Sequence, residues 1–92
     1  MKRNILVVDD EPAMIDMMKT FLESEGYAVH TASNGEEALE FARNYEVELV
    51  ISDIEMPKMK GTTLFYELKQ VDPFIQIIIM TGNPTLSIIA NM

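Results

Sequence analysis

Short apolar runs alternate with stretches of helical spacing along this 92-residue chain. The apolar runs are brief and rich in β-branched residues, which favours strands over helices. Three of them are almost continuously apolar, as in parallel strands that are covered on both faces. Strands are therefore predicted over Ile5–Val8, Tyr27–Thr31, Val47–Ser52 and Ile75–Met80.

The stretches between these runs have apolar residues at steps of three and four, as on one face of an α-helix. Pro12 suits a first helical turn, and Gly26 is well placed to end the same helix. Ser33 or Asn34 can cap the next helix. Helices are predicted from Pro12 to about Glu25, from Gly35 to about Tyr45, over Thr62–Gln70, and from Pro84 to Met92.

Alternating strands and helices predict an α/β fold, a doubly wound parallel sheet with right-handed crossovers. Tyr27–Thr31 mixes polar and apolar residues, which is typical of an edge strand, so the expected strand order is 2-1-3-4. In such a sheet, ligands bind at the carboxyl ends of the strands, where the strand order reverses.

The end of the chain suggests that something is missing from the domain. In the order 2-1-3-4, Ile75–Met80 becomes an edge strand without charge or proline, which is a liability for aggregation. The last helix would stop without a cap and leave Ile88 and Ile89 uncovered. We therefore expect residues 1–92 to be an incomplete domain that ends within its fourth helix and lacks a fifth βα unit.

The composition of the chain argues against several classes of protein and of site. Seven Lys and Arg against fifteen Asp and Glu give a formal charge of −8, so this segment is not expected to bind nucleic acid directly. The chain has no cysteine, which excludes disulfides and thiolate metal sites. No apolar run is long enough to span a membrane, and the expected location is the cytoplasm.

Acidic residues follow the first and third predicted strands. Asp9, Asp10 and Asp53 should converge at the switch point of the sheet. Clustered carboxylates repel one another unless a cation neutralises them, and Mg²⁺ suits all-oxygen ligands. A carboxylate can also attack a phosphoryl group, while the Thr81 hydroxyl and the Gly82 backbone N–H are suited to contact phosphoryl oxygens.

Taken together, these motifs resemble one known family. Asp9-Asp10-Glu11, Asp53-Ile54-Glu55-Met56-Pro57 with Gly61, and Thr81-Gly82 follow successive strands in the order seen in the response-regulator receiver domain of two-component systems. The resemblance covers the whole chain. It implies a flavodoxin-like fold and a phosphoprotein of phosphorelay signal transduction that assists only its own phosphorylation and dephosphorylation and is not otherwise an enzyme. It also implies two partners, a histidine kinase and an output domain or separate partner protein.

The resemblance assigns roles to individual positions. Asp53 matches the phosphoacceptor, and Asp10 and Asp53 match direct Mg²⁺ ligands. Asp9 matches the acid that acts mainly through metal-bound water, and Glu55 matches the residue whose backbone carbonyl completes the metal shell. Thr81 matches the switch hydroxyl.

Two positions influence how long the phosphoryl group stays on the aspartate in this family. Their counterparts in this chain are Glu55 and Asn83. The family also has a lysine at the end of a fifth strand, for which this chain has no counterpart, and Lys58 and Lys60 lie in the wrong loop for that role.

Two other functions fit some of the same features. A truncated receiver can act as a self-associating interaction module without phosphotransfer, forming a homodimer through the edge of Ile75–Met80 or through the fourth helix. A phosphatase with an aspartyl-phosphate intermediate also has a second acid two residues after its nucleophile, as in Asp53-Ile54-Glu55. The chain is, however, too short for a separate substrate-binding cap. Aspartates before Pro12 can also serve simply as a helix cap.

Overall fold

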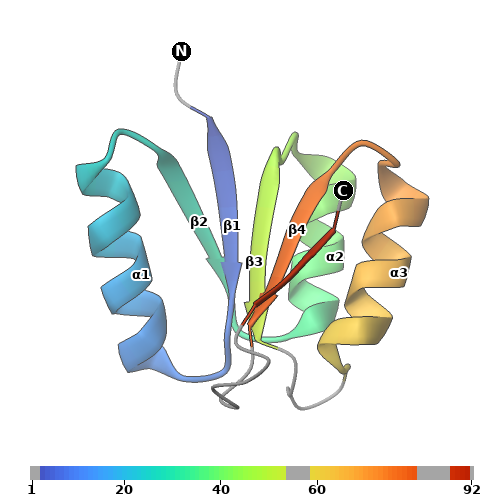
Figure 1. Ribbon diagram of the computed structural model, residues 1–92, viewed down its shortest axis with the longest axis horizontal. Coiled ribbons are helices and arrows are strands. Elements are labelled where there is room, and N and C mark those ends of the chain that lie inside the picture. The colour runs from blue at the N-terminus through green and yellow to red at the C-terminus, as the bar shows by residue number, and fades with distance from the viewer. Residues whose placement is uncertain (1–2, 54–58, 81–87, 92) are drawn as a thin grey trace.

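A computed structural model describes residues 3–53, 59–80 and 88–91 (Figure 1). The strands are β1 (Asn4–Val8), β2 (Ala28–Ala32), β3 (Leu49–Asp53), β4 (Gln76–Met80) and β5 (Ile88–Asn91). The helices are α1 (Pro12–Ser24), α2 (Gly35–Asn44) and α3 (Gly61–Val71). All four predicted strands and the first three of the four predicted helices are confirmed, with bounds that differ by at most two residues.

The strands form one sheet in the order β2-β1-β3-β4-β5. β1 to β4 are parallel, which confirms the predicted order 2-1-3-4 and the flavodoxin-like α/β fold. The chain reverses that order between β2 and β3, on either side of β1, so the switch point predicted from the sequence lies at the carboxyl ends of β1 and β3.

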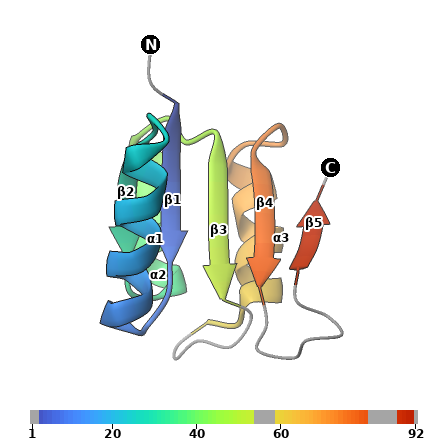
Figure 2. The same cartoon turned by 60° about the vertical axis from the view of Figure 1, so that its left-hand side comes forward.

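The sheet separates two layers of helices. α1 lies on one face and α2 and α3 on the other (Figures 1 and 2). Successive side chains of a strand point to opposite faces, so each strand contributes to two cores. In β1, for example, Leu6 belongs to the cluster under α2 and α3, and Val7 belongs to the cluster under α1.

The larger cluster joins the sheet to α2 and α3. Leu64 and Leu68 of α3 are almost completely buried against it, as is Ala38 of α2. The smaller cluster places Leu22 of α1 against Ile5, Val7, Val29 and Ile51. These contacts hold β1 and β3 side by side and fix where their carboxyl ends meet.

Local signals account for the helix ends. The side chain of Asn34 accepts a hydrogen bond of 2.9 Å from the backbone N–H of Glu37, and the Glu37 carboxylate accepts one from the N–H of Ser33. This reciprocal pair is a capping box, one residue longer than the usual form. Gly26 follows α1 with φ +97°, a left-handed conformation that suits glycine.

The helix predicted from Pro84 to Met92 is wrong over the part that the structure describes. Residues 88–91 form the strand β5, which pairs antiparallel with β4 and sets Ile89 opposite Ile79. The edge of β4 offers a row of unpaired N–H and C=O groups, and a segment this short gains little as an isolated helix. Residues 84–87 and 92 lie outside the described residues.

This strand bears on two related predictions. The expectation of an incomplete domain that lacks a fifth βα unit stays a prediction, although residues 88–91 are not part of a helix. The outer edge of β4, expected to be free for a second copy, is paired with β5. β4 therefore has a neighbouring strand on its outer side, formed by residues 88–91.

Among the described residues, the longest helix is α1, with 13 residues. No described helix has the length and apolar character needed to cross a bilayer.

Candidate functional site

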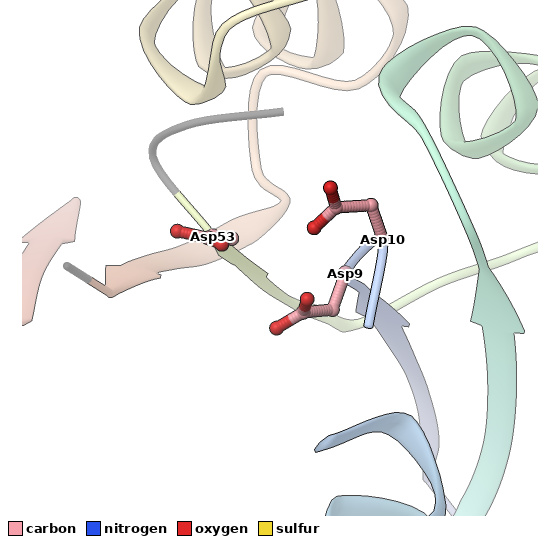
Figure 3. A group of neighbouring side chains, drawn as sticks. All are labelled: Asp9, Asp10 and Asp53. Carbon is pink, nitrogen blue, oxygen red and sulfur yellow. The ribbon is translucent and has the colours of Figure 1, made fainter. Parts of the chain in front are cut away.

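The acidic site is built at the carboxyl ends of β1 and β3. Val8 lies opposite Ser52 in the parallel register, so the residues that follow, Asp9 and Asp53, emerge at the same edge of the sheet. Asp10 is the next residue after Asp9. The three side chains gather at one point (Figure 3), and one carboxylate oxygen from each lies within 4.8 Å of the others. The structure thus confirms the prediction that the side chains of Asp9, Asp10 and Asp53 lie close together.

Asp9 is the buried member of the three, with 6% of its surface exposed. Its backbone N–H donates to the carbonyl of Ala32 at 3.1 Å, and its Oδ1 accepts from the backbone N–H of Glu11 at 2.9 Å. The first bond ties the end of β1 to β2. The second orients the carboxylate at the start of α1.

Burial raises the pKa of the Asp9 carboxyl above its usual value of 3.8. The negative charge of Asp53, followed by those of Asp10 and Glu11, raises that pKa further. The hydrogen bond from the Glu11 N–H acts in the opposite direction without reversing the shift. The cluster therefore concentrates negative charge that proton uptake or a cation would relieve.

The other two carboxylates are more accessible. Asp10 is exposed and Asp53 is half-buried. Ser52, which is buried beside Asp53, donates its hydroxyl to the Asp53 carbonyl oxygen at 2.9 Å. An oxygen-only donor set with one buried and two accessible carboxylates fits a hard divalent cation that keeps part of its water shell.

The structure leaves part of the predicted site untested. Glu55, Thr81, Gly82 and Asn83 lie outside the described residues.

Sequence reasoning missed the contacts that orient Asp9. An Asp that accepts from the N–H two residues later is a common turn, so the Asp9–Glu11 bond has a recognisable local signal in an aspartate that closely precedes Pro12. The bond from Asp9 to Ala32 joins residues far apart in sequence and has no such signal.

The family model for the response regulator receiver domain matches residues 5–92. This chain belongs to that family. The receiver domain is a signalling domain of two-component response regulators, and members of the family generally are not catalytic enzymes. Phosphorylation and magnesium are typical of the family. The resemblance inferred from the acidic motifs is thus confirmed.

Relatives and solved structures agree with this assignment. The transcriptional regulatory protein GlrR of Escherichia coli is 40% identical over 83 residues, which are 90% of this chain and 19% of GlrR. A CheY-like receiver domain protein from Methanospirillum hungatei superposes with a TM-score of 0.88 at 36% identity, covering 94% of this chain and 69% of that one.

A third similar protein was solved with ligands. The response regulator TrrA of Thermotoga maritima, in complex with Mg²⁺ and BeF, has a TM-score of 0.85 and 40% identity to this chain. The alignment covers 91% of this receiver domain and 73% of TrrA. By contrast, this receiver domain spans only about a fifth of the length of GlrR.

Proposed function

We propose that Asp53 is a phosphoacceptor that a histidine kinase phosphorylates in the presence of Mg²⁺. The observation that carries this proposal is the meeting of three carboxylates from two strand ends within 4.8 Å. Membership of the receiver family supports it. So does the Mg²⁺ and BeF complex of TrrA, which is similar over 91% of this chain.

The metal would be held by Asp10 and Asp53 directly, by Asp9 mainly through water, and by the backbone carbonyl of Glu55. When bound, Mg²⁺ would neutralise the carboxylates and the developing phosphoryl charge. The buried Asp9, oriented by the Glu11 N–H, sets one wall of this site. Its raised pKa reflects burial first and then the negative charges of Asp53 and Asp10, and a divalent cation would offset the unfavourable charge.

The protein's own part in the transfer is the nucleophile. A carboxylate oxygen of Asp53 attacks the phosphorus, the bond between phosphorus and the donor breaks, and an aspartyl phosphate forms. The hydrogen bond from Ser52 to the Asp53 carbonyl fixes the backbone from which this side chain extends. A fixed backbone limits the positions that the nucleophile samples.

Residues beyond the described part complete the proposal. The Thr81 hydroxyl and the Gly82 backbone N–H would contact phosphoryl oxygens, and Thr81 would act as the switch. The side chains of Glu55 and Asn83 would tune how fast the aspartyl phosphate is lost.

The wider context follows the relatives. We propose that this receiver acts in the cytoplasm and relays its state to an output domain or a partner protein. GlrR, a transcriptional regulator, is one relative in which a matching segment is part of a much longer chain. The net charge of −8 argues against direct nucleic-acid binding by this segment.

The alternative, a self-associating module without phosphotransfer, is not favoured by these comparisons. The structure also changes both surfaces on which it relied, since β4 is paired with β5 and residues 88–91 are not helical.

Incubation with acetyl phosphate and Mg²⁺, followed by intact-mass spectrometry, tests the proposal. The chain should gain the mass of one phosphoryl group, and EDTA should prevent the gain. Asp53→Asn should abolish it, because the amide is no nucleophile here. Asp16→Asn, which removes an exposed acid of α1 outside the site, should leave it intact. A phosphoryl group on Asp53→Asn, or none on the parent chain, would contradict the assignment.

A further inference from the structure

A surface hollow of about 650 Å³ lies beside α2 and the edge strand β2, and none of its residues belongs to the acidic site. Its lining comes almost entirely from one side of α2 and the residue that follows this helix. The lining residues are Thr31, Glu37, Glu40, Phe41, Asn44 and Tyr45.

Aromatic rings form one wall of this hollow. The rings of Phe41 and Tyr45 are stacked with centroids 4.6 Å apart, and the ring of His30 lies tilted at 4.8 Å from that of Phe41. Tyr45 is 63% exposed, so its ring is accessible from solvent. An accessible ring in a supported stack is a platform on which a planar cation can lie.

Two carboxylates supply negative charge at the same place. Glu40 accepts from the Asn44 amide at 2.8 Å, and Glu37 accepts from the N–H of Ser33 at 2.9 Å. The amide that donates to Glu40 is neutral, so this bond positions the Glu40 carboxylate without cancelling its charge. No lysine or arginine is among the described residues that line the hollow. The negative charge of Glu40 is therefore complementary to a cation.

The neighbouring strand offers backbone groups to a ligand. The Ala28 N–H donates to Arg3, and the Ala32 carbonyl accepts from Asp9, so even-numbered residues of β2 face β1. The N–H and C=O of Val29 and Thr31 then face away from β1, because backbone groups alternate along a strand. β2 has β1 as its one partner in the described sheet. An extended peptide can add to such an edge.

We propose that this surface binds an extended segment of a partner protein that carries an arginine. The guanidinium stacks on Tyr45 and faces the carboxylate of Glu40, while the main chain of the segment pairs with Thr31. Arginine fits better than lysine because its planar, delocalised charge stacks on an aromatic face and donates in a fixed fork. This surface is separate from the phosphoacceptor site, so it serves recognition of a second protein.

NMR titration of the 92-residue chain with a short acetylated, amidated peptide of valine and threonine around a central arginine tests this proposal. The peptide should shift the amide resonances of Val29 and Thr31 and the ring resonances of Tyr45. The same peptide with citrulline, which is planar but neutral, should bind at least about threefold more weakly, as should the lysine version.

Variants of the chain test the contributions of the Glu40 carboxylate and the Tyr45 ring separately. Glu40→Gln and Tyr45→Leu should each weaken the arginine peptide by about threefold, and Tyr45→Phe should keep the affinity. Glu36→Gln makes the same charge change on α2 outside the hollow and should bind like the parent. Equal binding of the citrulline peptide would overturn the proposal. Equal binding of the lysine peptide, or unchanged affinity in both Glu40→Gln and Tyr45→Leu, would do so as well.

Discussion

At the scale of single residues, Asp9 shows how the fold places charge where it is unfavourable. Its carboxylate is 6% exposed, oriented by the Glu11 N–H, and set beside two other acids. Burial, more than its neighbours, raises its pKa. The buried charge of Asp9 therefore destabilises the folded chain, and the cation proposed for this site would offset that cost.

We expect Asp9→Asn to raise the melting temperature at pH 7 in EDTA. The Asp9 pKa is higher in the folded chain than in the unfolded chain, so ionised Asp9 penalises folding above the folded pKa. The penalty fades as the pH falls through that pKa, and the gain from Asp9→Asn should fade with it. Asparagine retains an oxygen for the Glu11 N–H. Thermal unfolding between pH 7 and pH 4 measures the effect.

Magnesium should reduce the stability advantage of Asp9→Asn over the parent chain. The parent chain should gain stability from Mg²⁺ at pH 7, and Asp9→Asn should gain less because one negative charge is lost from the site. Asp16→Asn, an exposed change on α1, should behave as the parent in both buffers. An Asp9→Asn chain that is less stable than the parent in EDTA would show that the acidic cluster is not strained.

At the scale of elements, the ends of helices differ in how firmly they are fixed. α2 starts with a side-chain cap, in which Asn34 accepts from the Glu37 N–H. α3 starts at Gly61, and the residue before it, Lys60, makes no side-chain capping bond. α2 carries most of the residues of the proposed arginine surface. The Asn34 cap at the start of α2 therefore supports that surface.

Asn34→Ala should lower the free energy of unfolding by about 1 kcal/mol, because the Glu37 N–H loses its acceptor. Lys60→Ala provides the matched control, since this position makes no capping bond, and it should change stability by less than about 0.5 kcal/mol. Urea unfolding followed by circular dichroism gives both values. Equal losses in the two variants would mean that the Asn34 bond contributes nothing.

The sequence predicts most elements because their signals are local. Apolar runs such as Ile5–Val8 and caps such as Asn34 can be read within a few residues. β5 is not predicted in that way, because its pairing with the edge of β4 joins segments that no local signal connects. For the site, the convergence of Asp9 and Asp53 follows from parallel topology, while the bond from Asp9 to Ala32 depends on tertiary packing.

At the scale of the whole molecule, stability rests on two clusters separated by the sheet. The cluster under α2 and α3 contains Leu68, which has no exposed surface. Exposed apolar residues also occur, and Phe74 is 87% exposed. Leu68 and Phe74 are both apolar but differ in burial, so truncating each of them tests how much burial contributes to stability.

Leu68→Ala should cost about 2–5 kcal/mol of unfolding free energy, because it removes buried methyl groups and leaves a cavity. Phe74→Ala removes a larger side chain from solvent and should cost less than about 0.5 kcal/mol. Chemical denaturation measures both, and comparable losses would place Phe74 in a contact that the structure does not show.

The acids stand at the ends of β1 and β3, while both clusters lie between the sheet and its helices. In β1 and β3, the acidic residues of the proposed site thus lie at the strand ends, and the residues that stabilise the fold lie along the strands. In evolutionary terms, the interior of this domain can exchange one apolar residue for another without altering the three carboxylates. The proposed phosphoacceptor site can then be kept while the residues of the scaffold beneath it change.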